Sequence, residues 1–75
     1  MNLSPLAHRI MMMAAEHNVQ PGQPLPEAAF DLMLNEEATH IGEALMELYI
    51  EGLLEEVPHE VDLLTEAGAE YISAK

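Results

Sequence analysis

Hydrophobic residues recur at helical spacing near the start of the chain, directly after a serine and a proline. Ser4 can cap free amide groups and Pro5 fits a first helical turn, so the pattern predicts a helix from these residues to about Asn18. Side chains three, four and seven residues apart share one face of a helix. The predicted core stripe consists of Leu6, Ile10, Met13, Ala14 and His17.

Three further apolar residues of this helix, Met11, Met12 and Ala15, lie outside the predicted core stripe. They make the helix apolar on more than one side, and a monomer would expose them. Two interpretations stay open. The three residues pack beneath the next helix, or they form an association surface, a use to which flexible methionine side chains are suited.

A loop and a second helix are predicted next. Two prolines and a glycine within residues 19–24 interrupt both helix and strand. The segment Leu25-Pro26-Glu27 then predicts a helix start, because proline is tolerated there and an early glutamate is favourable to the helix dipole. Asn35 is expected to close this helix in a left-handed conformation. Its predicted inner face consists of Ala29, Phe30, Met33 and Leu34.

A third helix is predicted over about Ala38 to Glu51, with Thr39 or Asn35 as its cap. Gly52 is expected to end it, because glycine reaches the left-handed conformation without steric penalty. One face of this helix is apolar and comprises Ile41, Ala44, Leu45, Leu48 and Gly52. The opposite face carries His40, Glu43, Glu47 and Glu51. A second apolar edge is formed by Met46, Ile50 and Leu53.

Two short apolar stretches, 53–57 and 60–64, flank Pro58-His59 and predict a β-hairpin. Thr65 is expected to cap a short last helix over residues 66–72, in which a glycine is an unfavourable helix former. The hairpin residues expected to cover the helical core are Leu54 and Val57, with Val61 and Leu63 or Leu64.

Two segments resemble elements of the winged helix-turn-helix regulators. Residues 44–55, ALMELYIEGLLE, look like the end of a recognition helix that runs into the first wing strand. Residues 64–68, LTEAG, resemble the Leu-Thr-x-x-Gly element with which many of these regulators leave the second wing strand. The resemblance implies one winged-helix domain over residues 1–75, mainly α with a small β-hairpin. Its expected parts are three helices, a short wing and a short C-terminal helix.

The charge of the chain argues against DNA binding, the function that this family most often has. Two basic residues stand against fourteen acidic ones, which gives a formal net charge of −12. The resemblance implies that the start of the third helix enters the major groove and that the wing tip, residues 58–60, lies near the DNA backbone. Glutamates near phosphate repel it, and no arginine there offsets the repulsion. The residues that would face DNA are Thr39, His40, Glu43 and Glu47.

Catalytic and metal-binding patterns are weak in this sequence. Glu37-x-x-His40 and Glu56-x-x-His59 have the Glu-x-x-His spacing of some metal sites, but the second contains Pro58, and such sites need further glutamates on facing helices. The chain has no cysteine, glycine-rich phosphate loop or nucleophile elbow. We therefore predict that the protein is not an enzyme and holds no metal or cofactor.

Several observations bear on location. No apolar run approaches the roughly 20 residues that span a bilayer. The apolar run Ile10–Ala15 follows a single arginine and lacks a small-residue cleavage site, so a signal peptide is not predicted. The absence of cysteine suits a reducing compartment. We expect a cytoplasmic protein without membrane contact.

Glutamates are the most pronounced chemical feature. Glu43, Glu47 and Glu51 recur every four residues and would form a row with about 6 Å per step, comparable to the spacing of phosphates along a DNA strand. Such a row would attract a basic protein and quicken its association. The predicted acidic, partner-binding face consists of Glu36, Glu37, His40, Glu43, Glu47, Glu51, Glu55 and Glu56. The predicted apolar association surface consists of Met11, Met12, Ala15, Met46 and Ile50.

The function predicted from these features is that of a protein–protein interaction module. It would act as an inhibitor or antirepressor of a DNA-binding protein, of the kind that phages and prophages encode as small acidic chains. A homodimer is expected, because the apolar surface would serve self-association as well as partner docking. Two alternatives stay open: a homodimeric structural or assembly module whose acidity only confers solubility, and a winged-helix transcription regulator that binds DNA.

Overall fold

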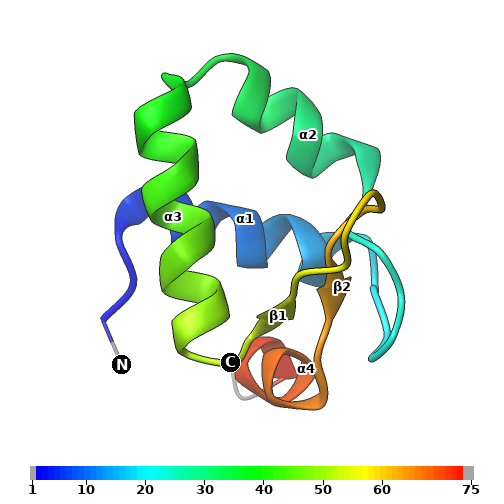
Figure 1. The fold of residues 1–75 in the computed structure, drawn as a ribbon. Helices are drawn as coiled ribbons and strands as arrows, with labels where there is room; N and C mark the ends of the chain where they lie inside the picture. The colour runs from blue at the N-terminus through cyan, green and yellow to red at the C-terminus, as the bar shows by residue number, and fades with distance from the viewer. Residues whose placement is uncertain (1, 74–75) are drawn as a thin grey trace.

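The computed structural model describes residues 2–73, which form helices and one small antiparallel hairpin (Figure 1). This confirms the prediction of a mainly α fold with a small β component. In chain order the elements are α1 (Pro5–Glu16), α2 (Glu27–Leu34), α3 (Ala38–Ile50), β1 (Leu54–Glu55), β2 (Leu63–Leu64) and α4 (Glu66–Ser73).

The start of α1 follows the predicted capping chemistry. The Ala7 N–H donates to Ser4 Oγ at 3.3 Å, and Pro5 occupies the first turn. The helix ends at Glu16, two residues before the expected end, because Asn18 already has a left-handed backbone with a φ of 52°. Helix α1 therefore turns into the following loop earlier than its apolar pattern predicts.

The buried face of α1 is rotated relative to the predicted stripe. Helix α1 contacts α2, α3 and α4, so it is enclosed on more sides than a surface helix. Met11 is 0% exposed, and its assignment to an association surface is therefore wrong. His17 is exposed, so it is not a core residue as predicted, whereas Met13 is partly buried and packs against the core. The buried residues of α1 are Leu6, Ala7, Ile10, Met11 and Ala14.

The turn between α2 and α3 differs from the prediction. Asn35 has a φ of −94°, so it closes α2 without a left-handed backbone. Glu37 occupies the cap position of α3 without a side-chain hydrogen bond, so neither Thr39 nor Asn35 acts as the predicted cap. The inner face of α2 is narrower than expected: Ala29 and Met33 are buried, whereas Phe30 and Leu34 are 38% and 81% exposed.

The end of α3 forms as predicted. Gly52 has a φ of 74°, in the left-handed region that glycine adopts without penalty. The Gly52 N–H donates to the Tyr49 carbonyl at 3.0 Å, and the Leu53 N–H donates to the Leu48 carbonyl at 2.9 Å. This pair of bonds is the Schellman arrangement that satisfies the last carbonyls of a helix. It turns the chain sharply from α3 into β1.

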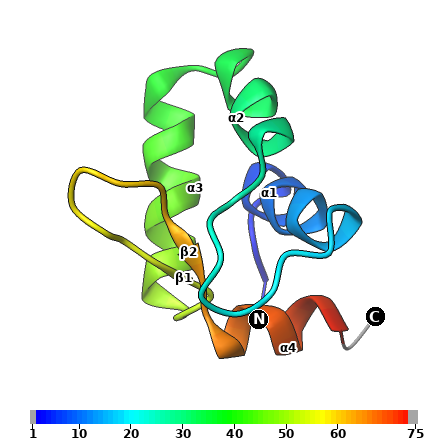
Figure 2. The same ribbon diagram turned by 90° about the vertical axis from the view of Figure 1, so that its right-hand side faces the viewer.

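The hairpin strands are shorter than predicted, with Leu54 opposite Leu64 and Glu55 opposite Leu63. The hairpin loop, residues 56–62, projects past α3 and away from α1 and α2 (Figure 2). Val61 is exposed in this loop, so it does not cover the core as predicted. A longer loop forms because Pro58 cannot donate a ladder hydrogen bond and His59 has a left-handed φ of 65°.

The segment between α1 and α2 is more ordered than its prolines and glycine predict. Its residues lie along the free edge of β2, where Pro24 pairs with Leu63. The Gly22 N–H donates to the Leu64 carbonyl at 2.8 Å, and the Leu64 N–H donates to the Gln23 carbonyl at 2.9 Å. This segment therefore covers a strand edge that would otherwise be open.

Thr65 and Gly68 fix α4 against the end of α3. The Thr65 hydroxyl donates to the Gly52 carbonyl at 2.5 Å and accepts from the Gly68 N–H at 2.9 Å. This confirms Thr65 as the cap of α4. Gly68 is buried, and a Cβ added there would overlap the Leu53 carbonyl oxygen and lie 2.7 Å from Leu64 Cδ1. Glycine is therefore required for the contact between α4 and the α3–β1 turn.

The core draws its buried hydrophobic residues from α1, α2, α3, both strands and the adjoining loops, and α4 packs partly buried hydrophobic residues against it. Among residues 2–73, none of the buried side chains is polar or charged. Side chains with functional chemistry therefore lie at the surface or in partly buried positions around this core. The buried hydrophobic residues are Leu6, Ala7, Ile10, Met11, Ala14, Val19, Leu25, Ala29, Met33, Ala44, Leu48, Leu53, Leu54 and Leu64.

Candidate protein-binding surface

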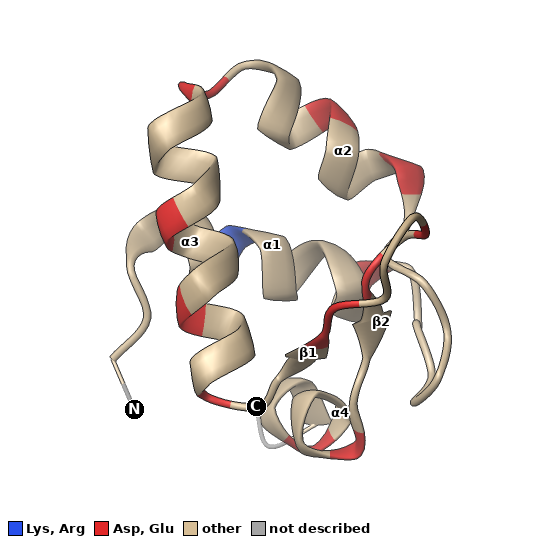
Figure 3. Ribbon diagram, in the orientation of Figure 1, with Lys and Arg blue, Asp and Glu red and all other residues tan. Residues whose placement is uncertain are grey.

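Acidic residues lie on all four helices and on the hairpin, while Arg9 is the one lysine or arginine within the described range 2–73 (Figure 3). The predicted acidic face is therefore part of a broader negative surface. On α3, Glu43 and Glu47 stand one helical turn apart, and Glu51 follows directly after the last helical residue. The spacing expected for the first part of the glutamate row is thus present on a regular helix.

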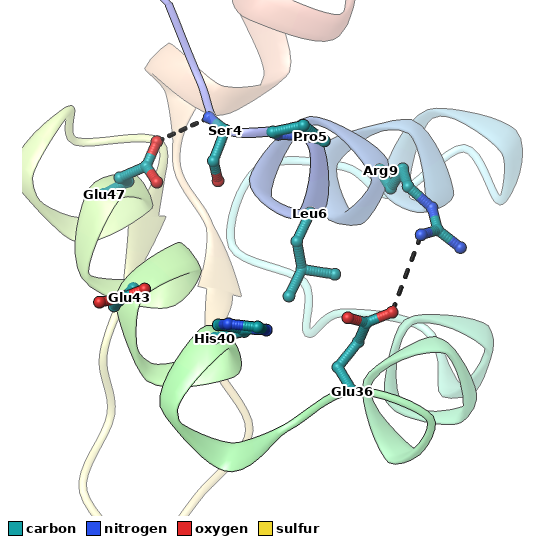
Figure 4. A pocket seen from close by; sticks show the side chains of 8 residues that line it. All are labelled: Ser4, Pro5, Leu6, Arg9, Glu36, His40, Glu43 and Glu47. Atoms are coloured by element: carbon teal, nitrogen blue, oxygen red, sulfur yellow. Dashed lines mark hydrogen bonds and ion pairs between the residues drawn. The ribbon is translucent and has the colours of Figure 1, made fainter.

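Four residues of the predicted acidic face come together in one cleft of about 280 Å³ (Figure 4). The N-terminal segment and α1 form one side of this cleft, and α3 with the turn before it forms the other. The acidic-face residues that line it are Glu36, His40, Glu43 and Glu47. The remaining lining residues are Ser4, Pro5, Leu6 and Arg9, and no sequence pattern indicates that they belong to this site.

Two carboxylates in this cleft already have partners within the chain. Glu47 Oε1 accepts a hydrogen bond from the Ser4 N–H at 2.8 Å. Arg9 Nη1 lies 3.8 Å from Glu36 Oε2. This ion pair lies at the end of the cleft opposite the hydrogen bond between Ser4 and Glu47 (Figure 4). The Arg9 side chain is 56% exposed, so this pair contributes about 1 kcal/mol at most. His40 and Glu43 lie on α3 and are exposed to solvent.

The other four residues of the predicted acidic face do not line this cleft. Glu37 and Glu51 occupy the two ends of α3, as its N-cap and C-cap residues. Glu55 lies in β1, and Glu56 begins the hairpin loop. These four are exposed, so they extend the negative surface along α3 and onto the hairpin.

A second, shallower depression of about 660 Å³ runs along the outer face of α3; we call it the α3 groove. Met46 and Ile50 are 55% and 75% exposed in it. Glu43 and Glu47 line both the cleft and the α3 groove, so they form the ridge between the two. The lining residues of the groove are Ala38, Thr39, Gly42, Glu43, Met46, Glu47 and Ile50.

The predicted apolar association surface is divided by the fold. Met46 and Ile50 are exposed together on α3, while Met12 and Ala15 on α1 are partly buried. Met12 packs against the core. With Met11 fully buried, the exposed apolar part of this predicted surface is the pair on α3.

Tyr49 connects the end of α3 to the hairpin. Its hydroxyl donates to Asp62 Oδ2 at 2.5 Å. Burial raises the pKa of Tyr49 well above 10.0, and the hydrogen bond to Asp62 and the negative charges of Asp62 and Glu56 raise it further. The neutral phenol therefore holds the base of the hairpin loop beside α3. The pairing joins residues 13 apart, and no local sequence pattern indicates it.

This contact predicts a loss of stability at high pH. The pKa of Tyr49 is raised in the folded state. The neutral phenol therefore contributes fully to the free energy of unfolding below pH 10, and this contribution declines above that pH, where the Tyr49 hydroxyl ionises in the unfolded chain. Urea denaturation between pH 8 and pH 11 should show this decline. Tyr49→Phe should be less stable by about 1 kcal/mol at pH 8 and should show a smaller decline. If the free energy of unfolding declined equally with pH in the unmodified chain and in Tyr49→Phe, the role given to the Tyr49 hydroxyl would be contradicted.

Within residues 2–73, no three histidine or acidic side chains are placed to hold a metal ion together. Over the same range, no helix combines the length and the hydrophobicity that crossing a bilayer requires. Comparisons with protein-family models, with curated proteins and with solved structures found no match to the chain. The surface of α3 and its surroundings are therefore the basis for a functional proposal.

Proposed function

We propose that the chain is a winged-helix protein that binds a basic protein partner through α3. The order of elements supports the winged-helix part of this proposal, because a helical pair, α2 and α3, precedes a hairpin with a projecting loop. The segment 22–25, which pairs with β2, supports it as the third strand-like segment of such a sheet. The contacts of Thr65 and Gly68 give the family-like LTEAG element a physical role.

The observation that carries the proposed function is the composition of the outer face of α3. This face exposes Glu43 together with Met46 and Ile50, and residues 38–50 contain no lysine or arginine. Nucleic-acid binding depends on basic side chains that release counterions from phosphate. An apolar strip bordered by carboxylates is instead suited to a protein that offers both apolar and basic side chains.

A DNA-binding protein is the partner class that fits best. Its DNA-binding surface is basic, and the step of about 6 Å between Glu43 and Glu47 is comparable to the step between phosphates. By covering that surface, the chain would keep the partner from DNA, which is the action of an inhibitor or antirepressor. A cytoplasmic location belongs to this proposal, because such partners work on DNA.

Charge reversal on α3 tests the proposal. The variant carries Glu43→Lys, Glu47→Lys and Glu51→Lys, and each change raises the net charge by two, from −12 to −6 in total. A partner recovered from host extract and identified by mass spectrometry is purified for the binding measurements. Three lost or reversed charge contacts should weaken its binding by about 100-fold, since each contributes about 1 kcal/mol. Its association rate with the unmodified chain should fall as salt is added.

A matched control separates the position of the charges from their number. Glu16, Asp31 and Glu70 are exposed on α1, α2 and α4, and reversing all three gives the same net charge. This control should bind the partner within about threefold of the unmodified chain, because surface charges far from the contact act mainly through screened attraction. Equal loss in both variants would reject α3 as the binding surface. Recovery of only copies of the chain itself would reject the basic partner.

A homodimeric assembly module is the second candidate function. The exposure of Met46, Ile50 and Leu34 favours it, because removing large apolar side chains from water between two copies would stabilise the dimer. The formal charge of −12 on each copy opposes it through repulsion. Sedimentation velocity at low and high salt distinguishes the candidates, since salt should strengthen a homodimer and weaken binding to a basic partner.

A further inference from the structure

Two parallel rows of side chains run along the outer face of α3. One row is spaced by four residues and begins with small side chains, Ala38 and Gly42, followed by Met46 and Ile50. The adjacent row is offset by one residue and is acidic over most of its length. It consists of Thr39, Glu43, Glu47 and Glu51. From Ala38 to Ile50 the apolar row is about 18 Å long, at a rise of roughly 1.5 Å per residue.

Rows spaced by four residues are the ridges and grooves with which helices pack on one another. Gly42 lies in the middle of the apolar row, and a Cβ added there would meet nothing within 4 Å. A side chain of a second helix can therefore reach the α3 backbone at Gly42. Beyond it, Met46 and Ile50 offer exposed apolar contact area on the same line.

We propose that the α3 groove binds an amphipathic helix of the partner, with apolar side chains on Gly42, Met46 and Ile50 and basic side chains against Glu43 and Glu47. The inference rests on the proposed function and specifies its binding mode. A helix of about 12 residues, with apolar positions repeating every three or four residues and Lys or Arg beside them, matches the length and the two rows.

Charge complementarity selects this occupant over a second copy of the chain. A second copy would bring fourteen more acidic residues and its own glutamate row toward the ridge. A basic helix instead places cations beside Glu43, which is exposed on the ridge. Because the groove itself is mostly apolar, the basic side chains are needed along one edge only.

Peptide binding to the full chain tests the inference. The probe is a helical peptide of leucine and lysine, about 18 residues long, patterned so that leucines occupy one face. A peptide of the same composition in permuted order has the same charge without that face. Two-dimensional NMR of the isotope-labelled chain should place the largest shifts at residues 38–50. The patterned peptide should bind at least tenfold tighter than the permuted one, since only it presents an apolar face.

Three variants give the test its specificity. Met46→Ser with Ile50→Ser should weaken peptide binding by about 30-fold, because most of the apolar contact is removed. Phe30→Ser with Leu34→Ser, the matched exposed pair on α2, should leave it within threefold. Gly42→Leu should fill the middle of the groove and weaken binding by at least tenfold. Circular dichroism should show an intact fold in all three, because each site is exposed or open.

Each contrary outcome has a defined meaning. Equal binding of the two peptides, or shifts centred on Arg9 and Glu36, would overturn the groove as the site. Displacement of a homodimer by the peptide would identify a second copy as the occupant, and the same shifts with a short DNA duplex would identify nucleic acid. If charge reversal on α3 abolishes binding of the natural partner but Met46→Ser with Ile50→Ser does not, the groove inference fails while the proposed function stands. If neither set of changes affects that partner, both fail.

Discussion

Gly68→Ala is expected to lower the free energy of unfolding by about 3 kcal/mol, at the upper end of the cost of overpacking a core. The added Cβ would overlap the carbonyl oxygen of Leu53, and that oxygen belongs to the backbone of the α3–β1 turn. A flexible side chain could move aside at little cost, but this turn is held by Gly52 and by the cap of α4. A chain of this length has roughly 4–11 kcal/mol of stability in total.

Gly42→Ala provides the matched control, because a Cβ there meets nothing within 4 Å and the residue lies inside α3. Alanine is the better helix former, so this variant should be more stable by up to about 1 kcal/mol. Urea denaturation followed by circular dichroism measures both variants. A loss of less than about 1 kcal/mol for Gly68→Ala would mean that α4 can shift away from the turn.

Met11→Ala is expected to lower the free energy of unfolding by about 2–5 kcal/mol, the usual cost of truncating a buried methionine. Met11 is fully buried where α1 is enclosed by the other helices. Met46→Ala changes the same side chain at a site that is 55% exposed, and its effect should stay within about 0.5 kcal/mol. The comparison separates burial from the general effect of removing a methionine.

The same denaturation experiment measures this pair at neutral pH. Similar losses for Met11→Ala and Met46→Ala would mean that the core around α1 is loosely packed. Such a result would also indicate that Met11 contributes to an exposed surface. A large difference would leave Met46 free to be changed in binding experiments without loss of the fold.

Local chemistry explains which parts of the fold could be predicted from the sequence. Ser4, Gly52 and Thr65 each act on backbone groups within a few residues, and each has the predicted role at the end of a helix. The residue type of Asn35 predicts a left-handed conformation, whereas its φ of −94° lies outside that region. Residue type limits such positions, while the path of the chain into the next helix decides them.

Tertiary packing explains what the sequence could not indicate. The buried face of α1 depends on contact with three other helices, so a single helical stripe did not predict that Met11 is buried and His17 exposed. Likewise, the contact between the Ser4 N–H and Glu47 joins residues 43 positions apart. The glutamate spacing on α3 was readable because it is a local property of one helix. The cleft beside it was not, because α1 and the N-terminal segment complete it.

The Thr65 hydroxyl has a consequence for the dynamics of the chain. By bonding both to the Gly52 carbonyl and to the Gly68 N–H, it joins the end of α3 to the first turn of α4. A terminal helix of eight residues would usually fray on its own, at little free-energy cost. Here, opening that first turn also frees the carbonyls of Gly52 and Leu53 in the α3–β1 turn, which accept hydrogen bonds from the Thr65 hydroxyl and the Thr65 N–H. The C-terminal helix and the α3–β1 turn therefore belong to one cooperative unit, so amide hydrogens in both segments exchange with solvent through the same opening.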